Sequence, residues 1–347
     1  MTERVEVAES QHYVQQAYQK GFYDVGKTNY WVFDKRLLIK SDGTIEKNDL
    51  KERGSRVTFE EDYFYESSFY EGKDFLEKRF FGPIDSEGIE ALRYMSSPDK
   101  HILPHAEIGI ILLKYISAQK FRTPKGIELL AKSQPKMSRE ALLEILQEVH
   151  KDMVITLGES IVEILDASSC DTKFIVSDAP VIEWNPLTSE VYADLYLLKG
   201  TQVIFPVNKD TCLIFTPREL GEGRLSKKQY LEPRINARKE GRLIFDIRKL
   251  QNLRTIENSD VGVINKLIKE RALRYVVGGK KEFLFPSGNL SHMGILIAPK
   301  SPKITGGIAT RIKGKVEGID EYGRKLEGKS LEDMQKFFDW IEKKKNL

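Results

Sequence analysis

The hydrophobic pattern of the chain is dense from its first segment. Apolar and aromatic side chains, with one histidine among them, crowd residues 11–18 and continue to Phe22. Chain termini are usually polar and frayed. The pattern therefore predicts that the start of the chain is fixed to the body of the protein.

Short runs rich in aromatic and β-branched residues, bounded by turn residues, predict strands. Residues 59–65 suit either a short edge strand or a loop. The other predicted strands are 30–34, 37–39, 174–176, 203–206, 212–215 and 295–297. Residues 177–180 form the turn after the strand at 174–176, and a polar loop at 208–210 joins two later strands as a hairpin.

Apolar residues at helical spacing predict a largely helical middle of the chain and further helices around it. Pro104 suits the first turn of one helix and Pro124 follows its end. The apolar spacing of another helix continues past Gly158 through Leu165. The predicted helices are 72–81, 85–95, 105–121, 138–157, 256–277 and 330–345.

These elements are segregated along the chain, which favours an α+β fold over a doubly wound sheet. We expect the helical central region to pack on a mixed or antiparallel sheet. The N-terminal strands and the segment 170–216 would build this sheet.

Composition and charge limit the classes of function. The 347 residues are 40% hydrophobic and 31% charged, and 55 basic against 52 acidic residues leave a net charge of +3. Nucleic-acid binding would therefore need a local patch. Two cysteines are too few for a disulfide framework, and the first residues lack a secretory apolar region. We expect a cytoplasmic protein that does not enter a membrane.

No complete catalytic or cofactor motif is present. A glycine-rich phosphate loop after a strand, a G-x-S-x-G elbow and a C-x-x-C pair are all missing from the sequence. His101 and His105 with Glu107 have the spacing of a zinc site. Pro104 is expected to begin a helix between the two histidines, which favours a structural role for them.

The order of several short landmarks resembles a bacterial family catalogued as domain of unknown function 4238. The landmarks that carry the resemblance are His12-Tyr13-Val14, Trp31-Val32-Phe33-Asp34, Phe64-Tyr65, Leu76-Glu77, Phe121-Arg122-Thr123-Pro124, residues 174–180, Ile204-Phe205-Pro206 and Asn265. Gln15 stands where the family usually has proline. The resemblance implies a domain at 1–280 with a basic insert at about 217–255, followed by an extension at 281–347. It implies no reaction.

Three polar landmarks are candidates for catalysis: His12, Glu77 and Asp178. A histidine serves as acid, base or ligand near neutral pH. Asp178 follows a buried strand, and Glu77 lies on an amphipathic helix. Each has a structural alternative: His12 satisfies nearby backbone, Glu77 is solvated or paired, and Asp178 accepts backbone hydrogen bonds in a turn.

Arg122, Tyr13 and Asn265 are the candidates for substrate binding. A guanidinium fork suits a phosphate or a carboxylate. The alternative for Arg122 is a cation placed at the end of a helix, where the helix dipole favours it.

Asp178 and Glu183 are the candidate pair for a divalent metal, with Mg²⁺ as the cofactor, because oxygen ligands suit this ion. The lysine that completes the pattern of many metal-dependent nucleases does not follow in register, so the pair lacks further support.

The basic stretch 218–254 is the best local feature for phosphate contacts. Its cations include Arg234 and Arg254, interleaved with Tyr230 and diluted by acidic residues. A solvated, salt-bridged face is the alternative.

Two hypotheses follow. The first is an enzyme that acts on a phosphodiester or nucleotide, such as a hydrolase of the nuclease type in a defence or toxin system, with nucleic acid or a nucleotide as partner. The second is a non-catalytic interaction or regulatory protein with a protein partner, in which the same landmarks form a buried hydrogen-bond network.

Overall fold

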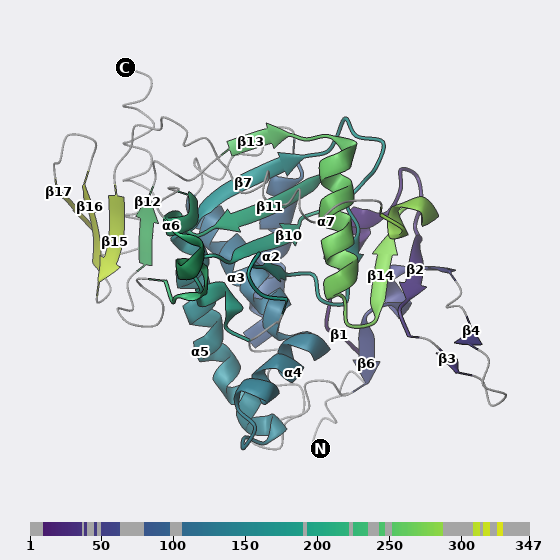
Figure 1. The fold of residues 1–347 in the computed structure, drawn as a ribbon, viewed down its shortest axis with the longest axis horizontal. Coiled ribbons are helices and arrows are strands. Elements are labelled where there is room, and N and C mark those ends of the chain that lie inside the picture. Colours follow the sequence, from purple (N-terminus) through teal and green to yellow (C-terminus); the bar gives the residue numbers. More distant parts are fainter. Residues whose placement is uncertain are drawn as a thin grey trace, which may run out of the picture.

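A five-stranded sheet forms the centre of the protein in the computed structural model (Figure 1). The strand order is β13-β7-β11-β10-β9, and only β13 and β7 run parallel. The strands are β7 (Ile161–Asp166), β9 (Ile182–Trp184), β10 (Gln202–Pro206), β11 (Thr211–Thr216) and β13 (Asn252–Thr255). The structure describes residues 10–36, 38–39, 45–46, 50–62, 80–97, 106–189, 193–221, 225–234, 243–246, 252–286, 308–312, 315–319 and 325–328.

In Figure 1, helices α2 (Gly82–Met95) and α3 (Ala106–Phe121) lie behind this sheet, and α4 (Pro124–Ser133) and α5 (Arg139–Gly158) extend below it. The ring of Phe205 on β10 joins the two layers, because it stacks on Tyr18 at 5.2 Å and meets the edge of Tyr115 at 6.4 Å. Both tyrosines and the phenylalanine are sealed from solvent, so this contact lies in the hydrophobic core.

A second sheet has the order β5-β2-β14-β8 and lies beside helix α7 (Asn258–Arg271) in Figure 1. Its strands are β2 (Tyr30–Asp34), β5 (Lys51–Arg53), β8 (Val176–Ser177) and β14 (Tyr275–Gly278). Strands from the first and second halves of the chain thus pair here, and all neighbours are antiparallel.

Smaller elements complete the described chain. The remaining strands are β1 (Ser10–His12) with β6 (Glu60–Asp62), β3 (Leu38–Ile39) with β4 (Ile45–Glu46), and an antiparallel sheet of β12 (Leu243–Asp246), β15 (Ile308–Ile312), β16 (Lys315–Ile319) and β17 (Lys325–Gly328). The short helical turns are α1 (Gln16–Gln19), η1 (Lys20–Phe22), η2 (Ser55–Val57), η4 (Leu195–Leu197), α6 (Arg218–Gly221), η5 (Lys227–Leu231) and η7 (Lys281–Leu284).

The α+β class is confirmed, as are the anchoring of residues 11–22, the hairpin at 203–215 and the helix ending at Phe121. Ser138 caps α5 as its position suggests, since its side chain accepts the N–H of Ala141 at 3.3 Å. The single sheet expected from the N-terminal strands and the segment 170–216 is not formed: β9, β10 and β11 lie in the five-stranded sheet, β2 and β8 lie in the second sheet, and β3 and β6 each belong to a separate two-stranded pair.

Four boundaries differ from the sequence prediction. The helix α5 stops at Gly158, and the next apolar residues form the central strand β7, because a fully buried strand is apolar on both faces. Pro124 begins α4, a helix that the pattern did not predict. The predicted helix at 256–277 ends at Arg271 and continues as β14, and α2 begins at Gly82 with Pro83 in its first turn.

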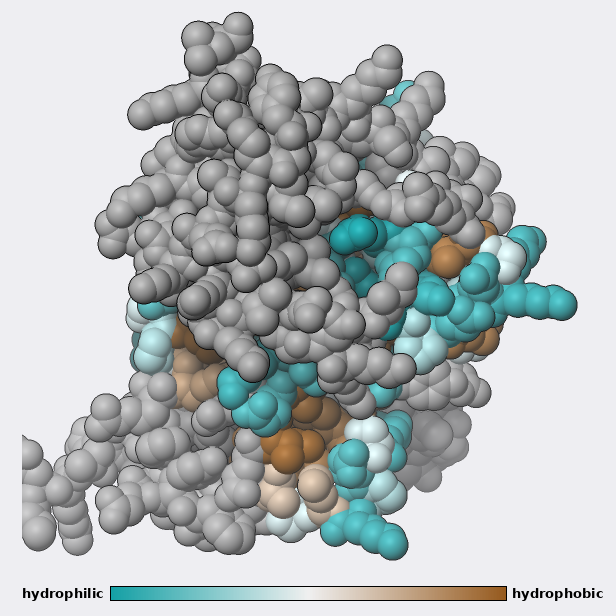
Figure 2. All heavy atoms as spheres, turned by 90° about the vertical axis from the view of Figure 1, so that its left-hand side faces the viewer, coloured by the Kyte–Doolittle hydropathy of each residue, from teal (hydrophilic) through white to brown (hydrophobic). Residues whose placement is uncertain are grey.

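Exposed apolar side chains are scattered over separate segments, such as Val25, Val57 and Leu253. On the face drawn in Figure 2, hydrophilic and apolar residues of the described chain are intermixed. Among the described residues, no helix combines the length and apolar character that crossing a membrane requires.

Several predictions lie outside the described residues. These are residues 72–79 of a predicted helix with Glu77, the histidines His101 and His105, the strand at 295–297, the C-terminal helix at 330–345 and the parts of the basic stretch at 222–224, 235–242 and 247–251.

Candidate functional site

His12 lies at the end of β1 and is mostly buried. Its Nε2 donates to the carbonyl of Arg56 at 3.1 Å, and its Nδ1 accepts from the amide of Gln16 at 3.3 Å. This pattern suits the neutral imidazole with its proton on Nε2. The carboxylate of Glu60 lies 3.8 Å from the same Nε2. Both ring nitrogens are therefore engaged with the protein.

Arg122 is sealed in the helical layer, with no exposed surface. Its Nη1 donates to Asp85 Oδ2 at 2.7 Å, and its Nε donates to the carbonyl of Tyr13 at 3.1 Å. The ring of Phe81 lies below the guanidinium at 5.7 Å. Arg122 thus ties α3 to α2 and to the start of the chain.

Asp178 is also buried, and it accepts backbone hydrogen bonds from a distant segment rather than within its own turn. Its carboxylate accepts three backbone N–H groups, from Leu273 at 2.9 Å, Arg274 at 2.6 Å and Tyr275 at 2.8 Å. Burial raises the pKa of Asp178, whereas these donors and the charge of Lys125 oppose the rise. Asp178 fixes the passage from α7 into β14.

Asn265 and Tyr13 have structural contacts as well. The Asn265 side chain accepts the N–H of Ile175 at 3.1 Å and donates to the carbonyl of Lys173 at 2.8 Å, which joins α7 to the segment before β8. Burial raises the pKa of Tyr13, and the nearby charge of Asp178 adds to this effect. A water-accessible cleft shared by His12, Arg122 and Asp178 is not formed, since Arg122 and Asp178 are sealed.

Two cations of the basic stretch are engaged with the protein. Arg234 is buried and donates to the carbonyl of Thr156 at 2.9 Å and to Ser160 Oγ at 3.1 Å. Arg254 Nε lies 3.6 Å from the buried carboxylate of Glu163. Both cations are thus engaged with the protein, and the buried Arg234 does not belong to a solvated face.

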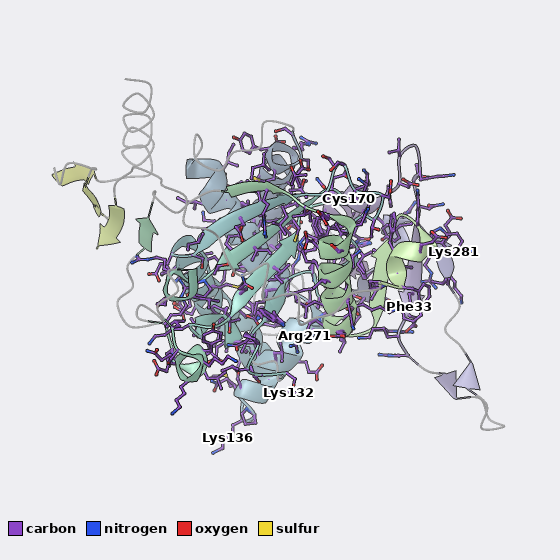
Figure 3. All side chains as sticks on the ribbon, turned by 45° about the horizontal axis from the view of Figure 1, so that its top comes forward. Phe33, Lys132, Lys136, Cys170, Arg271 and Lys281 are labelled. Atoms are coloured by element: carbon purple, nitrogen blue, oxygen red, sulfur yellow. The ribbon has the colours of Figure 1, made fainter. Side chains whose placement is uncertain are left out.

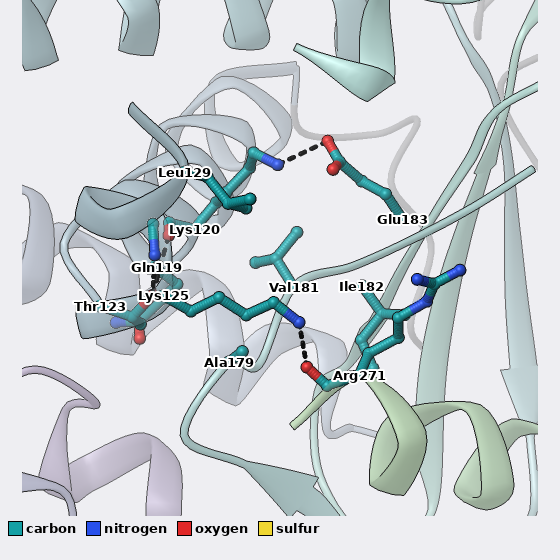
Figure 4. Close-up of a pocket in the computed structure, with 11 residues that line it drawn as sticks. Gln119, Lys120, Thr123, Lys125, Leu129, Ala179, Val181, Ile182, Glu183 and Arg271 are labelled. Carbon is teal, nitrogen blue, oxygen red and sulfur yellow. Dashed lines mark hydrogen bonds and ion pairs between the residues drawn. The ribbon is translucent and has the colours of Figure 1, made fainter. Parts of the chain in front are cut away.

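A pocket opens where two segments that the sequence analysis singled out, 121–124 and 177–180, approach each other (Figure 4). It contains about 360 Å³ of empty space, part of it open to solvent. The end of α3, the start of α4, the segment before β9 and the end of α7 surround it. The lining residues are Gln119, Lys120, Thr123, Lys125, Gly126, Leu129, Ala179, Val181, Ile182, Glu183 and Arg271.

A buried ion pair forms one side of the pocket. Lys120 Nζ lies 2.6 Å from Glu183 Oε1, and both side chains are almost fully shielded from water. Burial raises the pKa of Glu183, while the neighbouring Lys120 opposes this rise. Lys120 also lies over the rings of Phe121 and Tyr196, at 5.4 and 5.6 Å from their centres. Among the described residues that line the pocket, Glu183 is the only carboxylate, and it is already paired.

Lys125 and Arg271 form the opposite side. Lys125 Nζ donates to the backbone carbonyl of Arg271, and the Arg271 guanidinium donates to the carbonyl of Ser189 at 2.7 Å. Burial, and then the charge of Arg271, lower the pKa of Lys125 to about 8. Burial also lowers the pKa of Arg271. Figure 3 places Arg271 near the middle of the molecule, and Lys132 at the far end of α4.

The position of Lys125 in α4 is unusual for a cation. Pro124 and Lys125 form the first turn, and Thr123 caps it by accepting the N–H of Gly126 at 3.1 Å. The positive end of the helix dipole disfavours a cation there. Burial, the helix N-terminus and the neighbouring guanidinium of Arg271 all disfavour the charged form of Lys125. An anion bound in the pocket would offset these effects.

Gln119 connects the pocket to Arg122. In the orientation that satisfies its amide, the Gln119 oxygen accepts from Arg122 Nη2 at 2.5 Å, from Arg122 Nε at 3.3 Å and from the Tyr115 hydroxyl at 3.1 Å. Arg122 therefore positions the side chain of Gln119, which lines the pocket, although Arg122 is not itself a lining residue.

The two carboxylates considered for Mg²⁺ are surrounded by donors. Asp178 faces three backbone N–H groups, and Glu183 faces the ammonium of Lys120. The three N–H groups satisfy Asp178 without a metal, and the ammonium supplies the counter-charge of Glu183. Within the described chain, no group of three or more histidine, cysteine, aspartate or glutamate side chains is arranged to hold a metal ion.

Sequence reasoning missed Lys120, Lys125 and Arg271. Two signals could have found the lysines: Lys120 interrupts the apolar end of a helix, and Lys125 follows a proline that suits a helix start. Arg271 carries no comparable signal, because a cation in the last turn of a helix is ordinary.

Comparison with known proteins gives one family. Residues 10–282 match the model of a family described as protein of unknown function (DUF4238), which confirms the resemblance noted in the sequence. No curated protein and no solved structure matches the chain.

Proposed function

The chain belongs to the DUF4238 family of proteins of unknown function, and we propose that it is an enzyme. Its substrate would be a phosphodiester or a nucleotide, bound in the pocket between α3, α4 and α7. A hydrolase of the nuclease type in a cytoplasmic defence or toxin system is the specific form of this proposal.

The observation that supports the proposal is that three cations lie around a single carboxylate, which is already paired. Lys120, Lys125 and Arg271 line the pocket, and Glu183 neutralises only Lys120. Lys125 and Arg271 would contact the phosphate, because ammonium and guanidinium groups are the usual partners of phosphate oxygens. Their charges would stabilise the negative charge of the transferring group.

Lys125 also suits proton transfer. General acids and bases work best when their pKa lies near the working pH, and the pKa of Lys125 is about 8. Water would form the new bond to phosphorus as the bond to the leaving oxygen breaks, the Lys125 ammonium would give its proton to that oxygen, and the resulting amine would take up the proton released by the water. His12, Glu77 and Asp178 stay candidates for catalysis on sequence grounds, whereas the pocket geometry favours Lys125.

The test is turnover of RNA, DNA and free nucleotides, with and without Mg²⁺, by the wild-type protein and two lysine variants. Lys125→Met removes the pocket ammonium. Lys132→Met removes an exposed lysine of the same helix that pairs with Glu128. We expect loss of turnover in the first variant and wild-type turnover in the second. Equal turnover in both, or none in the wild type, would contradict the proposal.

A non-catalytic regulatory protein is the second candidate. The sealed contacts of Arg122, Asp178 and Asn265 favour it, because these landmarks are engaged in holding elements together. This candidate predicts ligand binding or a protein partner without turnover of any phosphate ester.

A further inference from the structure

We infer that a surface formed by β2, the last turn of α7 and the segment around η7 binds a single-stranded polynucleotide. The ring–lysine surface, as we call it, consists of the rings of Trp31, Phe33 and Phe285 and the ammonium groups of Lys269, Lys280 and Lys281. The inference rests on the proposed function, since it names a polymer as the substrate class. None of these six described side chains is among those that line the pocket.

Lys269 lies between two aromatic rings. Its Nζ is 4.3 Å from the ring centre of Phe33 and 4.4 Å from that of Phe285, and it donates to the carbonyl of Leu284 at 2.6 Å. The two rings meet edge to face, with their centres 5.6 Å apart. Phe285 is 54% exposed, so much of its ring faces water. An exposed ring beside a cation offers a base a stacking partner and the adjoining phosphate a counter-charge.

A second contact between a ring and a lysine lies on the same face of β2. Trp31 and Phe33 are two residues apart in this strand, so their side chains point to the same side of the sheet. The exposed Lys281 places its Nζ 4.0 Å from the ring centre of Trp31. Figure 3 shows Phe33 and Lys281 toward one end of the molecule and Arg271 near its middle. The long stem of Lys281 can move from the ring to a phosphate when a base stacks there.

The positive charge of this surface is not paired within the described chain. Among the described residues, no carboxylate forms an ion pair with Lys269, Lys280 or Lys281, whereas Lys120 pairs with Glu183. Three exposed carboxylates belong to the same or neighbouring elements: Glu52, Glu270 and Glu282. Because these acids leave the three ammonium groups unpaired, the phosphates of a polyanion are free to pair with them.

The exposed lysines of η5 have a different setting. Lys227 and Lys228 are adjacent in the chain and exposed, like Lys280 and Lys281. Within the described part of the chain, however, neither of them contacts an aromatic ring. They attract a polyanion by charge alone, so they give a control that matches the charge of Lys280 and Lys281 without the rings.

A purely structural role is the alternative reading of the ring–lysine surface. Cation–π contacts also stabilise a fold, and here they fasten α7 and η7 to the second sheet. Affinity for a polynucleotide separates the two roles, because a structural role changes unfolding and leaves binding unaffected.

Fluorescence anisotropy of the full chain with a labelled single strand tests the inference. The probes are oligothymidylate and oligouridylate of about eight nucleotides, a length within the range of single-strand sites. Unlabelled duplex DNA and inorganic polyphosphate compete with them. Each titration is repeated at several salt concentrations, because the salt dependence reports the number of phosphate contacts.

We expect both single strands to bind more tightly than the duplex, in which the bases are stacked on each other. The double variant Lys280→Gln with Lys281→Gln should lower the slope of log affinity against log salt by about 1.4, since each phosphate contact of a single strand contributes about 0.7. Phe285→Leu should weaken binding roughly tenfold, as expected for one lost base stack.

The control variant Lys227→Gln with Lys228→Gln should leave both the affinity and the salt slope unchanged. Circular dichroism and urea unfolding check that each variant is folded. The lysines of both pairs are exposed, so their replacement leaves the core intact.

Each remaining outcome decides the inference. Equal affinity losses in the two lysine pairs, or competition by polyphosphate as strong as by the unlabelled single strand, would reduce the interaction to charge and overturn it. A Phe285→Leu variant of lower stability and normal affinity would assign the rings a structural role. Binding that depends on these residues without any turnover would leave the inference standing and remove the proposed function, whereas turnover that is independent of them would do the reverse.

Discussion

Lys120 and Glu183 form an ion pair of 2.6 Å between helix α3 and the edge strand β9, with exposed side-chain fractions of only 6% and 2%. Two charges removed from water to this extent depend on each other, because no other charge among the described residues pairs with either of them at so short a distance. The pair therefore fixes the helical layer against the sheet at the side of the pocket.

Glu183→Gln should destabilise the protein by roughly 3–5 kcal/mol, because it leaves the Lys120 ammonium buried without its counter-charge. Urea unfolding measures the change. Glu148→Gln is the matched control, since Glu148 contacts Lys151 at the same 2.6 Å but both side chains are largely exposed. The control should unfold as the wild type does. Equal stability of both variants would show that the buried pair is not required.

Arg122→Lys should also destabilise the protein, by roughly 3 kcal/mol. A single ammonium cannot reach Asp85, the carbonyl of Tyr13 and Gln119 at once, whereas the guanidinium contacts all three. The midpoint of thermal unfolding should fall. Arg93→Lys, at an exposed arginine that pairs with Glu90, serves as the control and should leave the midpoint unchanged.

Asp178→Asn separates a structural role from a catalytic one. The amide has one acceptor oxygen for three backbone N–H groups, so at least one buried donor loses its partner. The expected cost is roughly 2–3 kcal/mol. Unfolding of this variant is compared with that of Asp171→Asn, at an exposed position. A variant of normal stability that lacks turnover would instead support Asp178 as a catalytic residue.

His150 should make stability depend on pH below neutrality. Burial lowers the pKa of His150 to about 4 in the folded protein, against about 6.5 when unfolded. The unfolded chain therefore binds a proton first, and stability falls as the pH drops from about 6.5 to about 4, by up to roughly 3 kcal/mol.

His150→Leu tests this pH dependence, because an uncharged side chain cannot titrate. The ring of His150 packs against Phe80 at 5.3 Å, and its Nδ1 makes no hydrogen bond, so leucine loses little. Urea unfolding at pH 4.5 and pH 7 should show a smaller difference for the variant than for the wild type. An unchanged difference would assign the pH dependence to other groups.

The candidate site shows where sequence reasoning succeeds and where it stops. The segments 121–124 and 177–180 were singled out, and both reach the pocket through Thr123 and Ala179. Their most prominent polar residues, Arg122 and Asp178, turn inward and hold backbone and side chains in place. A local sequence pattern does not reveal which neighbours surround a side chain, so it could not separate these supporting residues from Lys125.

The amino-acid sequence by itself determined the α+β class, the anchoring of residues 11–22, the helix that ends at Phe121 and the hairpin at 203–215. These features depend on the local spacing of apolar residues, on helix caps and on turn residues. Such signals lie within short stretches of the sequence. The tertiary structure decided that residues 161–165 form a central strand, that Asp178 caps the passage into β14, and that Lys125 meets Arg271. Each of these depends on contacts between residues about 50 or more positions apart, where burial and the charge of a distant neighbour outweigh local preference.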